Sequence, residues 1–280
     1  MKILLAGSSG QLAKEFIRFF ESENIDYKAP EERIFDITDK EKISSVFSAY
    51  NPTHVINCAA YNFVDEAQKY PQKAFSLNSE AVKNLAEECN KKHAFFMHFS
   101  TDYVFDGTKN ALYTEYDIPN PLNTYALSKL EGEKKAVISE RCAIFRLSWV
   151  IGEGERNFLR KLKSWSKNGR TLKISADEVS VPTFTFDIVP ACVKAVKEEL
   201  QGVFHLTNSG YASRYELARL YLKRNKFDNI IVPVPMESSN SPAKRPAFTA
   251  MSNAMLSSKL NIQMPSWEQS LEKYCEKYDD

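Results

Sequence analysis

Short apolar runs alternate with longer amphipathic stretches along the first half of the chain. Four short runs are largely apolar, as expected of strands buried on both faces: KILLAG (2–7), THVINCAA (53–60), AFFMHFS (94–100) and CAIFRLSWV (142–150). Helices are expected between these runs, beginning near Gln11, Pro71 and Pro121. Buried strands separated by helices predict an α/β fold with a Rossmann-type, doubly wound parallel sheet.

The pattern is looser after about residue 150. Helices are expected within residues 152–169, 184–200 and 213–224, a strand within 202–210, and largely irregular chain over 233–253. We therefore expect residues 1–150 to form the main domain, with elements near 184–206 returning to it. Residues 151–280 should form mainly a smaller, discontinuous C-terminal lobe.

Composition and charge narrow the class of protein. The chain has 280 residues, with 37 basic and 36 acidic side chains, so it lacks the electrostatic footprint of a nucleic-acid or membrane-surface binder. The apolar run MKILLAG is too short for a signal peptide, and no run reaches the roughly 18 residues of a membrane span. Five scattered cysteines without a CxxC pattern predict reduced thiols in a cytoplasmic protein. The four histidines lack metal-ligand spacing, so no metal site is predicted.

A glycine loop, GSSGQLA (7–13), follows the first predicted strand and opens the first helix. In that context Gly7 permits a tight turn, and Gly10 lets the backbone approach a pyrophosphate at the helix N-terminus. Taken alone, the loop could also be a plain strand–helix turn. With a doubly wound sheet, it predicts an NAD(P)-binding domain over residues 1–150 and a substrate-binding lobe after it.

The segment YKAPEERIFDITD (27–39) stands where a ribose-binding residue is expected. Glu31 or Glu32 could accept a hydrogen bond from a ribose 2′-hydroxyl, whereas Arg33 could neutralise a 2′-phosphate. The choice between NADH and NADPH therefore stays open. Asp36 with Ile37 could flank an adenine, or Asp36 could cap the following helix.

A third group of residues carries the candidate chemistry. The run HFSTDYVFDG (98–107) ends a predicted central strand and places Ser100, Thr101 and Asp102 at its carboxyl edge, where parallel sheets bind ligands. Tyr125 and Lys129 in PLNTYALSK (121–129) share one helix face. Alternatively, Tyr125 and Lys129 could be an ordinary exposed pair on the helix surface. The run KLEGEKK (129–135) has the composition of a solvated helix face. A hydroxyl, a phenol and an ammonium group together instead predict proton transfer.

These motifs resemble the dTDP-4-dehydrorhamnose reductase family of the extended short-chain dehydrogenase/reductase superfamily. The resemblance spans nearly the whole chain, through ILLAGSSGQLA, VINCAAYNFVDEAQ, STDYVFDG, PLNTYALSKLEGE, RLSWVIGEGERNF, DEVSVPT and PAKRP. It implies NAD(P)H-dependent reduction of the 4-keto group of a nucleotide-linked 6-deoxyhexose, as in conversion of dTDP-4-dehydro-L-rhamnose to dTDP-L-rhamnose. Tyr125 would donate the proton, Lys129 would favour the phenolate and hold the nicotinamide ribose, and Thr101 would donate to the carbonyl oxygen.

Further roles follow from the resemblance position by position. The cofactor would be bound by Gly7, Gly10, Gln11, Leu12, Asp36, Ile37, Ala60, Tyr61, Asn62, Phe99, Tyr125 and Lys129. The sugar nucleotide would be bound by Thr101, Asp102, Trp149 and Arg245. The chain departs from the family at Ala13, Asn62, Ala126 and Ser180, where a glycine, a threonine, a glycine and a glycine are usual. The change at Ser180 lies in a substrate-facing segment and leaves the sugar open.

Several alternatives stay open on the sequence alone. Arg245 could bind the substrate diphosphate or be an ordinary surface charge. The chain could be another sugar-nucleotide reductase or epimerase of the superfamily, or a non-catalytic NADP-binding regulatory subunit like that of methionine adenosyltransferase. The sequence does not decide whether Mg²⁺ is needed or whether two copies form a homodimer.

Overall fold

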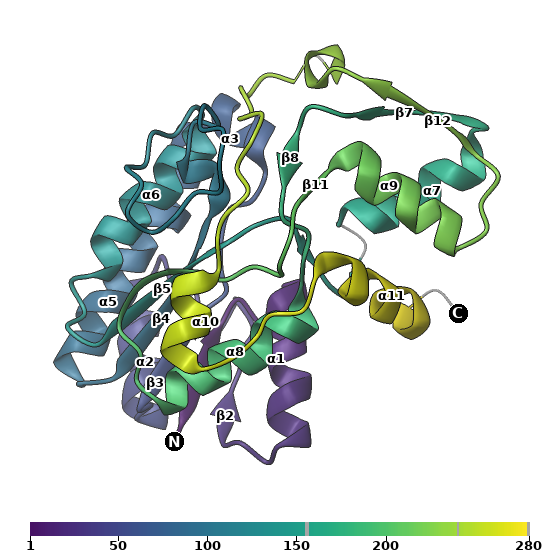
Figure 1. Cartoon of the computed structure of the whole chain (residues 1–280). Coiled ribbons are helices and arrows are strands. Elements are labelled where there is room, and N and C mark those ends of the chain that lie inside the picture. The colour runs from purple at the N-terminus through teal and green to yellow at the C-terminus, as the bar shows by residue number, and fades with distance from the viewer. Residues whose placement is uncertain (155–156, 240, 279–280) are drawn as a thin grey trace.

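The computed structural model describes residues 1–154, 157–239 and 241–278. Glu155 and Arg156 of the predicted substrate-facing segment RLSWVIGEGERNF lie outside these ranges. A six-stranded parallel sheet forms the main domain (Figure 1). Its strands, in spatial order, are β10 (Gly202–His205), β5 (Cys142–Leu147), β4 (Phe95–Thr101), β3 (His54–Asn57), β1 (Ile3–Ala6) and β2 (Tyr27–Lys28). The predicted α/β fold with a doubly wound parallel sheet is confirmed.

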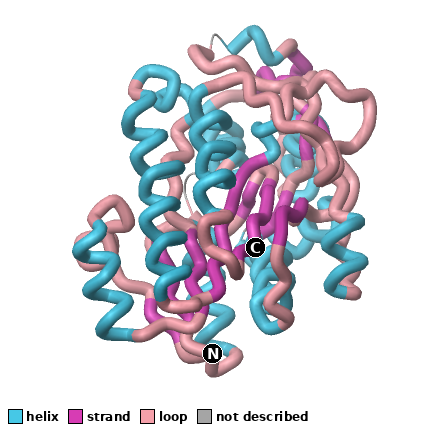
Figure 2. The backbone as a smooth tube through the Cα atoms, turned by 90° about the vertical axis from the view of Figure 1, so that its left-hand side faces the viewer, coloured by secondary structure: helices cyan, strands magenta, loops and turns pink. Residues whose placement is uncertain are grey.

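Helices cover both faces of this sheet, as Figures 1 and 2 show. Because helices cover both faces of the sheet, side chains on both faces of the strands are buried. This explains why the strand sequences are largely apolar. One face packs against α1 (Gln11–Ser22), α8 (Thr185–Lys197) and α10 (Ala254–Leu260). The other packs against α2 (Lys40–Tyr50), α5 (Ala81–Lys91) and α6 (Thr124–Ala136). Short α3 (Val64–Lys69), α4 (Pro71–Phe75) and the π-helix η1 (Ser76–Glu80) lead into α5.

A second lobe has its own apolar core and lies at the upper right of Figure 1. Its helices are α7 (Phe158–Asn168), α9 (Arg214–Arg224) and α11 (Trp267–Tyr278). Its strand pairs are β7 (Thr171–Ser175) with β12 (Ile230–Val234), β8 (Val179–Ser180) with β11 (Ala212–Ser213), and β6 (Val150–Ile151) with β9 (Thr183–Phe184). Between the segments of this lobe, α8, β10 and α10 pack with the main domain. The domain division at residue 150 stays a prediction.

Two details differ from expectation. Strand β12 and the 3-10 turn η3 (Met236–Ser239) extend into the segment predicted as largely irregular, because β12 finds a partner in β7. The cap of α2 is Asp39, which accepts hydrogen bonds from the N–H groups of Glu41 and Lys42. The Asp36 carboxylate instead accepts from Thr38, so the alternative role of Asp36 as this cap is wrong.

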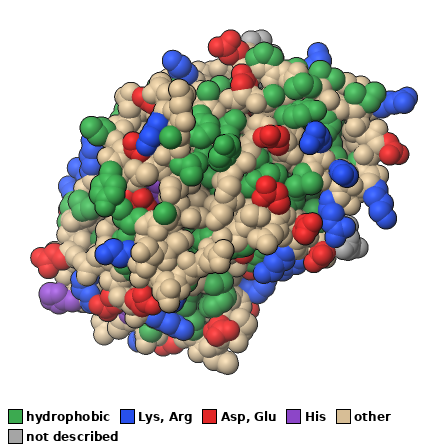
Figure 3. All heavy atoms as spheres, viewed as in Figure 1, with side chains coloured by type: hydrophobic (Ala, Val, Ile, Leu, Met, Phe, Trp, Pro, Cys, Tyr) green, Lys and Arg blue, Asp and Glu red, His purple; other side chains and the backbone are tan. Residues whose placement is uncertain are grey.

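Basic and acidic side chains are interspersed over the face seen in Figure 3, as the near-zero net charge suggests. Within the described parts of the chain, no helix is long and apolar enough to cross a membrane. The same residues contain no cluster of three or more His, Cys, Asp or Glu side chains suited to a metal ion.

Candidate active site

The glycine loop packs closely against the backbone of the segment that follows β3. Gly7 has a φ of +75°, and a Cβ there would lie 2.6 Å from the backbone nitrogen of Ala59. Both the conformation and the surroundings therefore require glycine. Helix α1 begins at Gln11, and its N-cap, Gly10, offers no side-chain acceptor to the first N–H groups. Those N–H groups are available to a negatively charged ligand.

The start of α6 fixes the positions of the candidate catalytic side chains. The Asn123 side chain accepts a hydrogen bond from the Ala126 N–H and so caps the helix. Tyr125 and Lys129 follow on the inner face, with only 9% and 3% of their surfaces exposed. The alternative of an exposed surface pair is therefore wrong.

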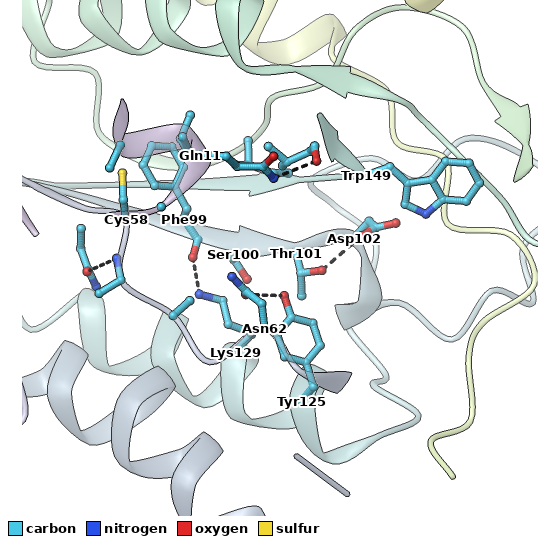
Figure 4. A pocket seen from close by; sticks show the side chains of 18 residues that line it. Gln11, Cys58, Asn62, Phe99, Ser100, Thr101, Asp102, Tyr125, Lys129 and Trp149 are labelled. Atoms are coloured by element: carbon cyan, nitrogen blue, oxygen red, sulfur yellow. Dashed lines mark hydrogen bonds between the residues drawn. The ribbon is translucent and has the colours of Figure 1, made fainter. Parts of the chain in front are cut away.

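These elements enclose an inner pocket of about 280 Å³ (Figure 4). Tyr125 and Lys129 point from α6 towards the end of β4, where Phe99 and Thr101 lie. The Tyr125 hydroxyl donates to Asn62 Oδ1 at 3.4 Å, and Lys129 Nζ donates to the Phe99 carbonyl oxygen at 2.5 Å. The pocket is lined by Gly10, Gln11, Leu12, Ala13, Asn57, Cys58, Ala59, Ala60, Asn62, Phe99, Ser100, Thr101, Asp102, Tyr125, Lys129, Leu147, Trp149 and Val150.

Burial dominates the electrostatics of this pocket. Desolvation raises the pKa of Tyr125 to about 12, against a smaller lowering by the Thr101 hydroxyl. Desolvation also lowers the pKa of Lys129 to about 8, although Glu133 acts in the opposite direction. The net shift of the Tyr125 pKa is upward, because the loss of water outweighs the hydrogen bond that lowers it, and the Lys129 ammonium group is bound to the Phe99 carbonyl oxygen.

A larger outer pocket of about 590 Å³ lies between the main domain and the second lobe. Four cationic side chains and one carboxylate are among its described lining residues: Lys161, Lys173, Arg214, Arg245 and Glu178. Apolar and aromatic side chains complete it, including Phe158, Trp165, Ile174, Val234 and Met236. A cavity with this excess of positive charge and these flat apolar walls suits a phosphorylated ligand with an aromatic ring.

Trp149 forms a wall of both pockets. Its φ of +37° is unusual for a bulky residue and is typical of a position that the surrounding fold constrains. The Arg214 guanidinium covers one face of the indole, 3.5 Å from the ring centroid, and pairs with Glu178 at 3.5 Å. Glu178 also accepts a hydrogen bond from the Tyr103 hydroxyl.

Arg245 reaches the outer pocket from the Pro-rich loop before α10. Its guanidinium bonds both carboxylate oxygens of Asp65, at 3.2 and 2.7 Å, and 19% of its side chain is exposed. This bidentate pair fixes the orientation of the guanidinium at the pocket wall. Arg245 is therefore not an isolated surface charge.

Most of the predicted site residues converge. Eight predicted cofactor residues line the inner pocket: Gly10, Gln11, Leu12, Ala60, Asn62, Phe99, Tyr125 and Lys129. Of the predicted substrate residues, Thr101, Asp102 and Trp149 line the inner pocket, and Trp149 and Arg245 line the outer one. Four others lie outside both linings: Gly7, Asp36, Ile37 and Tyr61. Ile37 is buried in the core beneath α2.

Asp102 lines the inner pocket but is almost fully buried, and hydroxyl groups of the protein hold its carboxylate. It is 3% exposed and accepts hydrogen bonds from four hydroxyl groups, those of Thr101, Ser148, Ser180 and Thr249. Burial raises the pKa of the carboxyl group, and the four hydroxyl donors act against that effect. Ser180, which departs from the family glycine, is fully buried and faces this carboxylate rather than a ligand.

Asn78 is a structural support of the site that sequence reasoning missed. It lies in η1, accepts from the Tyr61 N–H and donates to Ser128 of α6. It thereby ties the segment above the inner pocket to the helix that carries Tyr125. The available signal was a polar residue at an otherwise apolar position of the predicted helix.

The carboxyl edge of the sheet brings together the phenol of Tyr125, the amine of Lys129 and the hydroxyl of Thr101. This arrangement is typical of one class of enzyme. The chain is a nicotinamide-dependent oxidoreductase of the extended short-chain dehydrogenase/reductase type.

Comparison with known proteins identifies the family. The family described as "RmlD substrate binding domain" matches residues 1–279, and the chain belongs to it. A dTDP-4-dehydrorhamnose reductase from Clostridium acetobutylicum is 32% identical, with a TM-score of 0.97 and full coverage of both chains. The Bacillus anthracis dTDP-4-dehydrorhamnose reductase, solved in complex with NADP, is 30% identical, with a TM-score of 0.94 over 99% of each chain. The dTDP-4-keto-6-deoxy-D-glucose reductase of Streptomyces niveus is 30% identical, over 89% of this chain and 87% of that protein.

Proposed function

We propose that the protein reduces the 4-keto group of a nucleotide-linked 6-deoxyhexose, and that its substrate is dTDP-4-dehydro-L-rhamnose, which becomes dTDP-L-rhamnose. The observation that carries this proposal is the inner pocket, which places the Tyr125 phenol beside a glycine cradle and opens next to the cationic outer pocket. An acid, a dinucleotide site and a phosphate-binding site in one connected region are what such a reduction requires.

The inner pocket has the features of a nicotinamide-dinucleotide site. The free N–H groups at the start of α1 suit a pyrophosphate, and Gly7 leaves room where a Cβ would clash with Ala59. Lys129, whose amine is held at the end of β4, would hold the nicotinamide ribose. When bound, the reduced nicotinamide supplies the hydride that converts the carbonyl carbon to an alkoxide carbon.

Tyr125 supplies the proton. Its pKa of about 12 keeps the phenol protonated at neutral pH, yet an alkoxide is more basic and takes the proton. Burial removes water, so the phenol does not compete with solvent as the donor. Asn62, which accepts from the Tyr125 hydroxyl in this structure, orients the phenol towards the pocket.

The outer pocket would bind the nucleotide part of the substrate. Arg214, Arg245 and the two lysines Lys161 and Lys173 supply the positive charge that a diphosphate needs. Phe158 and Trp165 supply flat surfaces for the base. Trp149 lines both pockets and would contact the sugar, which carries the reacting carbon and is linked to the nucleotide.

A second sugar is favoured by one specific observation. The reductase of Streptomyces niveus, at 30% identity, is named for dTDP-4-keto-6-deoxy-D-glucose rather than for dehydrorhamnose. Relatives of similar identity are therefore named for different sugars. A dTDP-4-keto-6-deoxy-D-glucose reductase is the second candidate.

The deciding experiment follows NADPH and NADH oxidation with a panel of 4-keto-6-deoxyhexoses linked to dTDP, UDP or GDP. Turnover of dTDP-4-dehydro-L-rhamnose with the highest kcat/KM is expected, and Tyr125→Phe should abolish it. Highest kcat/KM with the D-glucose-derived sugar would select the second candidate. Absence of turnover with the whole panel by a folded, cofactor-binding protein would contradict the proposal.

A further inference from the structure

Asn123, which caps α6, also holds the loop of residues 241–246, here called the Arg245 loop. Its Oδ1 accepts from the Ala126 N–H at 2.9 Å, and its Nδ2 donates to the Lys244 carbonyl oxygen at 2.9 Å. Only this orientation of the amide satisfies both partners, because an N–H group donates and a carbonyl oxygen accepts. Asn123 is 6% exposed, so water competes little for either bond. One buried side chain therefore joins the start of α6 to a residue 121 positions further along the chain.

Helix α3 holds the same loop. The Asp65 carboxylate accepts from the Ala243 N–H at 3.2 Å and from the Arg245 guanidinium at 3.2 and 2.7 Å. One turn later, Gln68 Oε1 accepts from the N–H and from the hydroxyl of Thr124, at 3.2 and 3.0 Å. Since Thr124 is the first residue of α6, the Arg245 loop, α3 and the start of α6 form a closed ring of hydrogen bonds.

The bond from Asn123 acts on the backbone from which Arg245 extends. A peptide unit is planar, so a fixed Lys244 carbonyl oxygen also fixes the direction of the Arg245 backbone nitrogen. The pair between Asp65 and the guanidinium is held less firmly, because 39% of the Asp65 side chain is exposed and water competes for it. Arg245 lines the outer pocket. Asn123 is therefore a buried link between a cation of the outer pocket and the helix that carries Tyr125.

We propose that Asn123 is a positioning residue for substrate binding. Through the Lys244 carbonyl oxygen it fixes the backbone of the Arg245 loop, and so holds the cation that binds the substrate diphosphate in place relative to α6. This inference rests on the proposed function, in which the outer pocket binds a nucleotide-linked sugar. It gives the N-cap residue a second task that its position in the sequence, at the start of a helix, does not indicate.

Two substitutions separate this task from helix capping. Aspartate and serine cap helices about as well as asparagine. An ionised aspartate cannot donate to the Lys244 carbonyl oxygen, and the shorter serine side chain does not extend to it. Asn123→Asp and Asn123→Ser should therefore keep the start of α6 and release the Arg245 loop. Asn253→Ser is the matched control, because Asn253 donates to the Thr207 carbonyl oxygen at 2.9 Å and lies outside both pockets.

Trypsin provides a test that needs no substrate. It cleaves after lysine, and the bond after Lys244 begins at the carbonyl group that Asn123 holds. Cleavage there should be about three- to tenfold faster in both Asn123 variants than in wild type, because the loop opens more often. The rate is taken relative to cleavage after Lys92, at the exposed end of α5, so that a general loss of stability cancels. Asn253→Ser should leave this ratio unchanged, and an unchanged ratio in both Asn123 variants would overturn the proposal.

Kinetics then test whether the anchored loop serves the substrate. In both Asn123 variants KM for dTDP-4-dehydro-L-rhamnose should rise about three- to tenfold. The kcat and the Kd for NADPH should change by less than about twofold, because the cap of α6 and the inner pocket remain. Arg245→Ala already removes the guanidinium, so adding Asn123→Ser to it should raise KM by less than about twofold more.

Unchanged KM in the Asn123 variants would refute the positioning role, and so would an undiminished effect of Asn123→Ser in the Arg245→Ala background. A wild-type protein that did not turn over this sugar would contradict the proposed reduction instead. The trypsin ratio would still decide whether Asn123 holds the Arg245 loop, so the two failures are distinguishable.

Discussion

The Tyr125 side chain is the group on which the chemistry depends most directly. We expect Tyr125→Phe to lower kcat by about a hundredfold or more, because general acid catalysis by a positioned group contributes about that much. Cofactor binding should stay within about twofold of wild type, since the ring and its packing remain. Stopped-flow hydride transfer and fluorescence titration of NADPH measure the two effects.

Tyr50→Phe is a matched control, because Tyr50 is also a buried phenol but lies outside both pockets. It should retain kcat even if it loses some stability. Hydride transfer in Tyr125→Phe at the wild-type rate would remove Tyr125 from the role of acid.

Lys129 gives the free enzyme a pH dependence of known sign. Its pKa is lowered to about 8 by burial, so the ammonium group loses its proton as the pH rises through about 8. If the cation is needed to hold the ribose and the phenolate, kcat/KM should fall over that range. The limb should be missing from the pH profile of Lys129→Met, whose activity is low throughout.

The same pKa predicts the opposite trend for stability. The unfolded lysine titrates near 10.4, so between about pH 8 and pH 10.4 the unfolded state binds more protons than the folded state. The contribution of Lys129 to the free energy of unfolding therefore rises with pH in that window. Urea unfolding of wild type against Lys129→Met at several pH values measures it. A contribution that fell with pH would show that Lys129 is not desolvated.

At the level of elements, α6 and β5 are joined by a buried ion pair. Arg146 of β5 bonds both oxygens of Glu133 on α6, at 2.9 and 2.8 Å, with less than a tenth of either side chain exposed. Glu133→Gln would leave the guanidinium charge buried without its counter-charge. We expect a loss of about 3 kcal/mol in the free energy of unfolding, measured by urea denaturation.

Glu131→Gln is the matched control on the same helix. Glu131 pairs with Lys134 at the surface, and such pairs contribute about 0.5 kcal/mol or less. Equal losses in the two variants would show that burial does not set the importance of the Glu133 pair.

We expect the segment after β2 to influence the choice between NADH and NADPH. Glu31 and Arg33, the residues with opposed preferences, pair with each other at 2.7 Å and are both largely exposed. If both side chains lie at the ribose, as the sequence predicts, each partly cancels the preference of the other. We expect affinities for NADH and NADPH that differ by less than about a thousandfold, roughly 4 kcal/mol.

Titration of both cofactors tests this expectation, and Arg33→Ala should shift the ratio towards NADH. If the wild-type affinities for NADH and NADPH differ by more than a thousandfold, only one of the Glu31 and Arg33 charges influences the choice of cofactor.

Local sequence patterns were sufficient to predict the strands and helices of the main domain. They were insufficient where contacts between distant segments determine whether a side chain is buried. The strand runs and the helix start predicted near Pro121 are local signals, and they placed Tyr125 and Lys129 correctly on one helix face. The run KLEGEKK was expected to be solvated, yet Lys129 and Glu133 within it are buried. Composition could not show this, because the partner of Glu133 is Arg146, on another element. The π-helix around Asn78 likewise depends on contacts with Tyr61 and Ser128.

At the scale of the whole molecule, the outer pocket depends on segments far apart in sequence. Its lining runs from Gln11 to Arg245, so periodicity and spacing could not have assembled it. Trp149 and Arg245 were available from the family resemblance. Lys161, Lys173 and Arg214 were not, since each reads as an ordinary charge on a helix or strand of the second lobe.

A substitution at Arg245 tests whether the outer pocket binds the sugar nucleotide while the inner pocket binds the cofactor. Arg245→Ala should raise KM for the sugar nucleotide about ten- to a hundredfold, which corresponds to roughly 1.5–3 kcal/mol for a lost charge-assisted contact. The Kd for NADPH should be unchanged, because Arg245 does not line the inner pocket. Substrate kinetics beside cofactor titration give both quantities.

Lys244→Ala removes the same charge from the adjacent, exposed position, and should leave KM unchanged. A loss confined to cofactor binding in Arg245→Ala would place this loop at the other site.

Gln11, Trp149 and Val150 line both pockets, so the two ligands would have a wall in common. A wall that one ligand fixes in place costs the second ligand less to order, which makes their binding free energies interdependent. Thermodynamic reciprocity then requires that NADPH tighten the binding of the nucleotide by the same factor as the nucleotide tightens that of NADPH. Whichever ligand arrives first, the completed ternary complex has the same free energy, and only the route to it differs.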